Sequence, residues 1–270
     1  MLEALIDCGI GETRALVLEG SRVVEAHIER PGWRTGDVRA VRLSKRLERR
    51  GIVAADSVEA LLEPMPEATE GAALTVEVVR EALPESGRAR LAKVRATTAA
   101  LAFGPDLATR LVRYCHAHDV TRDLGDTLGD AGWDELADAA ATGFVPFDGG
   151  LLTISPTPAM TVIDIDGAGD LTSLANAAAV AAAQAIRCFG ITGSIGIDFP
   201  TLGDRAARMK LGELLDAHLP APFERTAING FGFVQIVPAP PGLADRTTAS
   251  RTGRDGCIDP AEASAAQHQH

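Results

Sequence analysis

The sequence has few aromatic side chains and few cysteines, and each scarcity excludes a class of site. Aromatic residues make up 4% of the 270 residues, and positions 34–102 contain no Phe, Tyr or Trp. A nucleic-acid-binding domain there would lack the rings on which unpaired bases stack, so it would bind by charge alone. The four cysteines (Cys8, Cys115, Cys188 and Cys257) form no Cys-x-x-Cys pair. This predicts reduced thiols and argues against a cysteine-bound zinc.

The start of the sequence is not typical of a targeting segment, and the sequence has no long apolar run. The first seven residues carry acids where a signal peptide needs basic residues, and no stretch is apolar enough to span a membrane. We therefore expect a cytoplasmic protein with no membrane contact. With 46% hydrophobic residues and 23% charged residues, the chain has enough apolar material for a large globular core.

The net charge of −11 has the wrong sign for a protein that coats nucleic acid through bulk attraction. The charge is unevenly spread, because residues 34–95 carry 12 Lys and Arg against 10 Asp and Glu. Within that segment, residues 39–50 hold six basic residues and one acid. An RNA track and an ordinary solvated strand face explain this run about equally well.

The apolar pattern changes twice along the chain. Strands are predicted over 2–7, 13–18 and 22–30, separated by glycine turns. The β-rich pieces that follow fit a small OB-type barrel, and they span 38–43, 51–62, 74–79 and 89–97.

Helices are predicted over 106–116 and 133–141, with a loop over 119–130 between them. From position 149 onward, strands alternate with helices over 171–189 and 204–218, which indicates an α/β unit. In the first of these two helices, Arg187 is interpreted as a plain surface charge.

Two aspartates, Asp164 and Asp198, each end an apolar run that is typical of a buried strand. Parallel strands joined by a helix cross over right-handedly and lie side by side, so both carboxylates should reach the same sheet edge. Adjacent carboxylates are tolerated when they share a proton or bind a hard cation, and Mg²⁺, with Mn²⁺ as an alternative, fits this geometry. Taken alone, an Asp at a strand end is more often a turn former or a helix cap.

Residues 149–166 (Gly-Gly-Leu-Leu-Thr-Ile-Ser-Pro-Thr-Pro-Ala-Met-Thr-Val-Ile-Asp-Ile-Asp) resemble a segment of the RNase E/G family. That segment reads Gly-Gly, an apolar strand, Thr-Glu-Ala and then Ala-Ile-Asp-x-Asn. Residues 193–199 resemble the family's Gly-Gly-x-Ile-x-Ile-Asp-Phe, and 232–236 stand where it has Phe-Gly-Leu-x-Glu-Met. The match is collinear from Met1 to Val237, including a Glu-x-Pro-Gly ending of the first strands at 29–32.

The resemblance implies an α/β (mixed α+β) fold in three parts. RNase H-like N-terminal strands (1–33 with 103–145) would be interrupted by the OB-type barrel (34–102). A DNase I-like α/β subdomain (146–238) would carry the metal site. The low-complexity residues 239–270 are predicted to be a disordered tail.

The resemblance also implies metal-assisted attack of water on single-stranded RNA, which leaves a 5′-phosphate. The family's metal-binding aspartates fall on Asp164 and Asp198. Its supporting asparagine falls on Asp166, which adds a third anion on the same strand face and is counted among the catalytic residues. As a turn former with Gly167, Asp166 has an equally good structural explanation.

Several family features are missing from this sequence. The family's Glu in Thr-Glu-Ala is Pro158, and the Arg before its Phe-Gly-Leu is Gly230. No counterpart of its 5′-end sensor lies between the barrel and the first helix, so end sensing is not expected. Its Cys-Pro-x-Cys zinc link is absent, so no zinc-linked oligomer is expected. The sequence does not indicate which protein partners it has.

The candidate RNA contacts are basic residues of the barrel, and one of them matches the family's Lys after a Val-x-Ile strand. They are Arg39, Arg42, Lys45, Arg80 (the matching position), Arg88 and Arg90.

The leading hypothesis is a Mg²⁺-dependent endoribonuclease. The alternatives are a catalytically impaired RNA-binding or scaffolding protein with the same fold, and a DNA-directed or small-phosphoester hydrolase.

Overall fold

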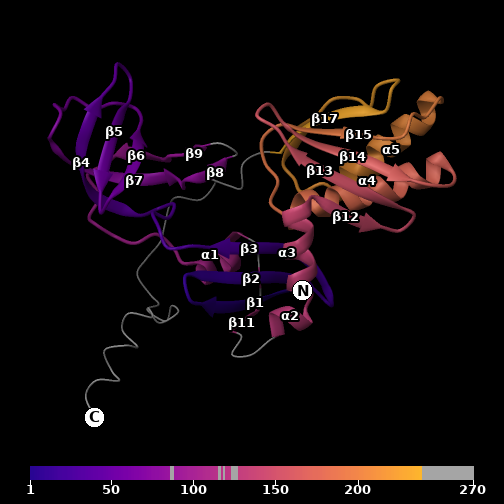
Figure 1. The fold of residues 1–270 in the computed structure, drawn as a ribbon, viewed down its shortest axis with the longest axis horizontal. Coiled ribbons are helices and arrows are strands. Elements are labelled where there is room, and N and C mark those ends of the chain that lie inside the picture. The colour runs from indigo at the N-terminus through magenta and orange to yellow at the C-terminus, as the bar shows by residue number, and fades with distance from the viewer. Residues whose placement is uncertain (86–87, 115–116, 118, 123–126, 239–270) are drawn as a thin grey trace, which may run out of the picture. The chain divides into compact units, whose positions relative to one another are not determined.

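The computed structural model describes residues 1–85, 88–114, 117, 119–122 and 127–238. The predicted disordered tail therefore lies outside the described residues. The chain divides into two compact units, one of residues 30–110 and the other of residues 1–29 and the chain from 111 onward. Both contain β-sheet, and the second adds helices, which confirms a mixed α and β fold (Figure 1).

Residues 30–110 form the barrel unit, whose five strands close on themselves. The order around the barrel is β4–β5–β6–β10–β7 and back to β4, and β6 and β10 are its parallel pair. A short hairpin of β8 and β9 forms a separate two-stranded sheet. The strands are β4 (Val38–Arg46), β5 (Gly51–Ala55), β6 (Val58–Leu62), β7 (Ala73–Arg80), β8 (Leu83–Glu85), β9 (Arg88–Arg90) and β10 (Ala92–Ala96).

The barrel forms because its strands alternate apolar and polar residues. Every second side chain turns inward, and Leu43, Val53, Leu62 and Val94 are fully buried in its core. Trp33, which precedes the first strand, packs into the same core. The closed barrel predicted from the sequence is thus present in the structure.

The second unit begins with a four-stranded sheet in the order β11–β1–β2–β3. The predicted antiparallel strands are present as β1 (Leu2–Gly9), β2 (Glu12–Glu19) and β3 (Arg22–Glu29). Residues 119–122, predicted as a loop, instead form β11, which pairs in parallel with β1. That pairing is made with a strand over a hundred positions away, so no local pattern announces it.

Both faces of this sheet are buried at its centre. Leu16, at the centre of β2, packs against Leu128 and Trp133 of two short helices on one face. Its neighbours Ala15 and Val17 are equally buried on the other face. The short helices are α2 (Thr127–Asp130) and α3 (Trp133–Thr142), and α1 (Leu107–Tyr114) runs across the division between the two units at residue 110.

A six-stranded sheet follows in the order β12–β13–β14–β15–β17–β16. Only β14 and β15 are parallel, and the other neighbours are antiparallel. In Figure 1, α4 (Leu171–Cys188) and α5 (Arg205–His218) run beside this sheet. Its strands are β12 (Phe144–Phe147), β13 (Gly150–Pro156), β14 (Thr161–Gly167), β15 (Ile195–Asp198), β16 (Phe223–Arg225) and β17 (Phe233–Pro238).

Helix α4 is the crossover between β14 and β15, and alanines allow it to lie close to its neighbours. It starts at the cap Asp170, whose side chain accepts a hydrogen bond from the backbone N–H of Ser173 (2.8 Å). Small side chains on several faces let it contact the six-stranded sheet, α5 and β3. The alanines buried on α4 are Ala175, Ala178, Ala179, Ala182, Ala183 and Ala185.

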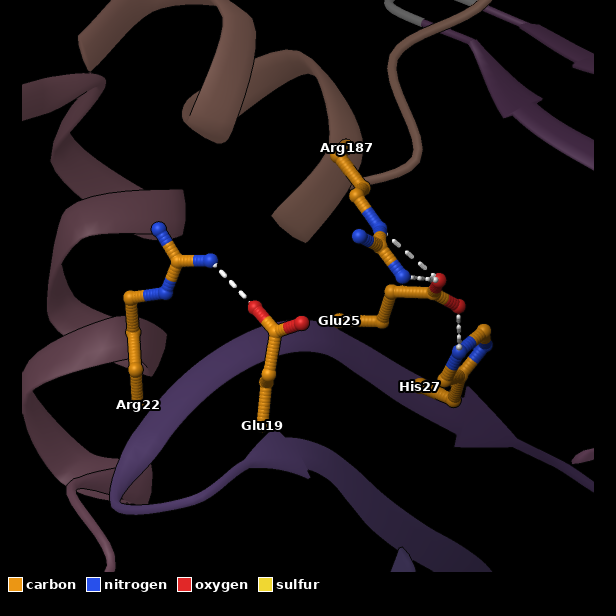
Figure 2. A network of polar contacts seen from close by, with 5 residues as sticks. All are labelled: Glu19, Arg22, Glu25, His27 and Arg187. Atoms are coloured by element: carbon orange, nitrogen blue, oxygen red, sulfur yellow. Dashed lines mark hydrogen bonds and ion pairs between the residues drawn. The ribbon is translucent and has the colours of Figure 1, made fainter. Parts of the chain in front are cut away.

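The last turn of α4 is tied to β3 by an ion pair. Both Nε and an Nη of Arg187 donate to Oε1 of Glu25, at 3.1 and 3.0 Å, and Oε2 of Glu25 lies 3.1 Å from Nε2 of His27 (Figure 2). The side chains of Glu25 and Arg187 are 17% and 35% exposed. The interpretation of Arg187 as a plain surface charge is therefore wrong. Arg187 links the last turn of α4 to β3, across 162 sequence positions.

We expect the Glu25–Arg187 pair to contribute about 1 kcal/mol to the free energy of unfolding, because it is partly shielded from water. A double-mutant cycle in urea with Glu25→Ala, Arg187→Ala and the double variant measures this coupling.

The matched control is the cycle for Glu19 and Arg22. This pair is also short (2.6 Å, Figure 2), but both side chains are more than half exposed. Its coupling should be clearly smaller. Equal couplings for the two pairs would contradict a structural role for Arg187.

Two of the four cysteines lie within the described residues. Cys8 is disulfide-bonded, which contradicts the expectation that all thiols are reduced. Cys188 is free and buried at the end of α4. Burial, and then the negative charge of Glu25, raise the pKa of the Cys188 thiol to about 11. None of the described helices is both long and apolar enough to cross a membrane.

We expect iodoacetamide at pH 8 to leave Cys188 almost unmodified in the folded protein, because the reactive thiolate is scarce well below its pKa. Mass spectrometry of the peptide that contains Cys188 measures this, with the urea-unfolded protein as the positive control. Labelling at equal rates in the folded and unfolded states would show that the thiol is not buried and that its pKa is not raised.

Candidate active site

The two aspartates singled out from the sequence lie side by side in the six-stranded sheet. Asp164 of β14 is the register partner of Asp198 of β15, in the only parallel pair of the sheet. The parallel, side-by-side placement of these two strands, predicted from the sequence, is thereby confirmed. Adjacent strands are about 4.8 Å apart, so two carboxylates at paired positions can both reach an ion that binds each oxygen at about 2.1 Å.

The side chains of both aspartates point away from the core. Ile163, Ile165 and Ile197, their neighbours along the strands, are buried against α4. Because side chains alternate across a strand, Asp164 and Asp198 lie on the opposite face, which we call the open face, and both are exposed. Within the described residues, neither carboxylate is engaged in a hydrogen bond or an ion pair.

Asp166 lies two residues further along β14 and is also exposed on the open face. Its register partner is Leu151 of β13, and β15 has already ended at that level. Within the described residues, no three His, Cys, Asp or Glu side chains form a group that could hold a metal ion. Asp166 thus does not join Asp164 and Asp198 in a three-ligand group, and its catalytic role stays a prediction.

The carboxylate oxygens of Asp164 and Asp198 are suitable donors for Mg²⁺. Carboxylate oxygens are the hard ligands that Mg²⁺ prefers, and the ion is commonly held by one or two carboxylates together with substrate phosphate oxygens. The exposure of both carboxylates leaves room for such a substrate.

The register also places residues that sequence analysis missed beside the aspartates. Pairing through four strand interfaces puts Phe144, Thr153, Asp164, Asp198 and Phe233 in one row on the open face. The row therefore has a hydroxyl next to one aspartate and a phenyl ring next to the other. These neighbours depend on how the strands pair. The sequence shows only how apolar and polar residues alternate within each strand.

A tight turn before β17 fixes the end of this row. Oδ1 of Asn229 accepts hydrogen bonds from the backbone N–H groups of Phe231 (2.9 Å) and Phe233 (3.1 Å). Gly232 between them has φ +97°, and its carbonyl accepts a hydrogen bond from Phe199 N (3.2 Å). Phe199 directly follows Asp198, so the turn holds the edge at which the two aspartates lie.

The basic residues chosen as RNA contacts all lie in the barrel unit, but the structure does not leave them all available. Nη2 of Arg39 is 2.7 Å from Oδ2 of the fully buried Asp37. An Nη of Arg80 donates to the carbonyl of Leu91 (2.8 Å) on the barrel itself. The predicted basic track is therefore partly used for internal contacts.

The remaining candidates differ in how they are placed. Arg42 and Lys45 are exposed on β4, and an Nη of Arg42 also donates to the carbonyl of Gly71 (2.6 Å). Arg88 and Arg90 lie on β9, in the separate hairpin.

No protein-family model matches this chain, and no curated protein matches it. Any function must therefore be inferred from the site itself and from the sequence patterns given above.

We expect Gly232→Ala to lower the free energy of unfolding by about 2–4 kcal/mol. Its φ is positive, and an added Cβ would lie 2.1 Å from the backbone oxygen of Phe199. The matched control is Gly230→Ala two residues earlier, where a Cβ meets nothing within 4 Å, and the change should stay within about 0.5 kcal/mol. Urea unfolding measures both variants, and equal stabilities would show that the turn does not hold this edge.

Proposed function

We propose that this protein is a Mg²⁺-dependent endoribonuclease that hydrolyses phosphodiesters within single-stranded RNA and does not sense the 5′ end. The observation that carries the proposal is the register pairing of Asp164 with Asp198 on an open sheet face. The collinear resemblance to the RNase E/G family supports the choice of RNA as the substrate.

Asp164 and Asp198 would hold the ion, and the phosphate of the substrate would complete its coordination on the exposed side. When bound there, the ion neutralises charge that develops on the phosphate and lowers the pKa of the attacking water. The rigid β14–β15 pair keeps the two carboxylates at a fixed separation. Thr153, in the same row, offers a hydroxyl that can donate a hydrogen bond to a phosphate oxygen.

We further propose that the barrel is of the OB type and that the other two parts are RNase H-like and DNase I-like. The barrel order, with β6 parallel to β10, supports the OB type. The RNase H-like and DNase I-like descriptions of the other parts rest on the resemblance. Cytoplasmic location also stays a prediction, and the disulfide at Cys8 weighs against it, because such bonds are rare in the cytosol.

A catalytically impaired RNA-binding or scaffolding protein is the second candidate. It is favoured by the charges near the aspartates: Asp166 stands where the family has a neutral amide, and Pro158 and Gly230 stand where it has charged side chains. Added negative charge on the open face would repel a phosphate.

We expect purified protein to cleave a labelled, unstructured RNA in Mg²⁺, and EDTA to stop the cleavage. Asp198→Asn and Asp164→Asn should each lower the rate by about 100-fold or more, because a metal ion contributes several kcal/mol to stabilising the transition state. The control is Glu213→Gln on α5, an exposed carboxylate on a helix that packs on the covered face.

Cleavage that persists in EDTA, or that Asp198→Asn leaves unchanged, would contradict the nuclease proposal. RNA that is bound but stays intact would instead support the scaffolding candidate. DNA of the same sequence and a chromogenic phosphodiester, tested in parallel, distinguish RNA hydrolysis from a broader phosphoesterase.

A further inference from the structure

The barrel unit carries a pocket that the proposed function does not use. It has a volume of about 290 Å³ and lies beside the start of β4. Its walls are mainly apolar and include Ala40, Ala55, Leu101 and Phe103. Phe103 and Leu101 are 80% and 64% exposed, so two large apolar side chains face solvent next to one another. Exposed apolar groups gathered at a pocket mark a binding surface.

The barrel unit holds two aromatic rings just outside positions 34–102, the segment that was expected to offer no ring for a base to stack on. That expectation rested on positions 34–102, whereas the compact barrel unit extends from Arg30 to Arg110. It therefore includes Trp33, which is buried, and Phe103, which is exposed.

Phe103 is held in place by its backbone while its ring stays exposed. The preceding residue, Ala102, exchanges two hydrogen bonds with Val38 of β4 (2.8 and 3.1 Å). The following residue, Gly104, donates its N–H to Oδ1 of the buried Asp37 (2.7 Å). A ligand that stacks on this ring would not have to order the chain first, which favours binding.

Arg39 forms one side of the pocket, and its charge is already compensated. Its Nε and Nη2 both contact Oδ2 of Asp37 (2.9 and 2.7 Å). Its guanidinium carbon lies 5.6 Å from the ring centre of Trp33 and 5.9 Å from that of Phe103, so the rings hold it by cation–π contacts. Asp56 adds a carboxylate to the lining. The pocket is therefore poorly suited to a phosphate and well suited to an uncharged flat ring.

We propose that this pocket binds one unpaired base of single-stranded RNA, stacked on Phe103. The proposal rests on the proposed function only in taking RNA as the ligand. The phosphates of the same strand lie outside the pocket, where Arg42, exposed two residues after Ala40 on β4, provides a positive charge. Phe103 thus recognises the base by stacking, and Arg42 contacts the phosphate backbone by its charge.

The test measures binding of a fluorescein-labelled oligouridine to the full chain in EDTA, by fluorescence anisotropy at several salt concentrations. Phe103→Ala should weaken binding about tenfold at every salt concentration, and Phe103→Tyr should restore it. Arg42→Ala should instead lower the salt dependence, with a slope reduced by about one. Leu47→Ala, an exposed apolar residue of the same barrel outside the pocket lining, is the matched control and should bind as the wild type does.

A second variant reports contact directly. In Phe103→Trp, the new indole should lose fluorescence on addition of RNA, because a base stacked on it quenches its emission. The proposal is overturned if the wild type does not bind RNA. It is also overturned if Phe103→Ala binds as tightly as the wild type, or if the Phe103→Trp emission is unchanged at saturating RNA.

Failure of this proposal and failure of the nuclease proposal are distinguishable. RNA that binds in a Phe103-dependent way but stays intact in Mg²⁺ contradicts the nuclease alone. Metal-dependent cleavage together with Phe103-independent binding contradicts the base pocket alone.

Discussion

Close packing of the alanine-rich helix α4 is the constraint on which the second unit depends. Its small buried side chains bring it near the six-stranded sheet, α5 and β3 at once, and the Glu25–Arg187 pair ties its last turn to β3. Because α4 joins β14 to β15 from one side of the sheet, the two strands lie parallel and adjacent. Their last register pair is the pair of aspartates on which the nuclease proposal stands.

The two faces of the six-stranded sheet have different roles. One face carries the isoleucines that pack under α4 and α5, and this buried surface stabilises the sheet. The other face, on which both aspartates are exposed, presents a row of a hydroxyl, two carboxylates and two phenyl rings. Apolar burial on the covered face stabilises the sheet. The sheet can therefore hold charged groups side by side on its other face.

The barrel unit uses its charges in an unexpected way. Arg39, which looked like a phosphate contact, neutralises a fully buried Asp37 and lies between two aromatic rings. It helps to build a pocket and is not free to bind a polyanion. A basic run in the sequence shows only how many charges are present. Binding of a polyanion depends on which of these side chains reach the solvent without an internal partner. In this barrel Arg39 is half-buried and ion-paired, whereas the ring of Phe103 is exposed.

The sequence by itself determined the alternation of the barrel and sheet strands, the alanine-rich crossover helix and the two strand-ending aspartates, because each depends on local periodicity. It also predicted that Asp164 and Asp198 would be neighbours, since consecutive strands joined by a helical crossover commonly lie side by side in one sheet. Only the tertiary structure decided that 119–122 is a strand, that Arg187 is ion-paired and that Cys8 forms a disulfide. It alone placed Phe103 beside Arg39 and separated Asp166 from a three-ligand group. These features depend on contacts between residues far apart in the chain, which no local pattern encodes.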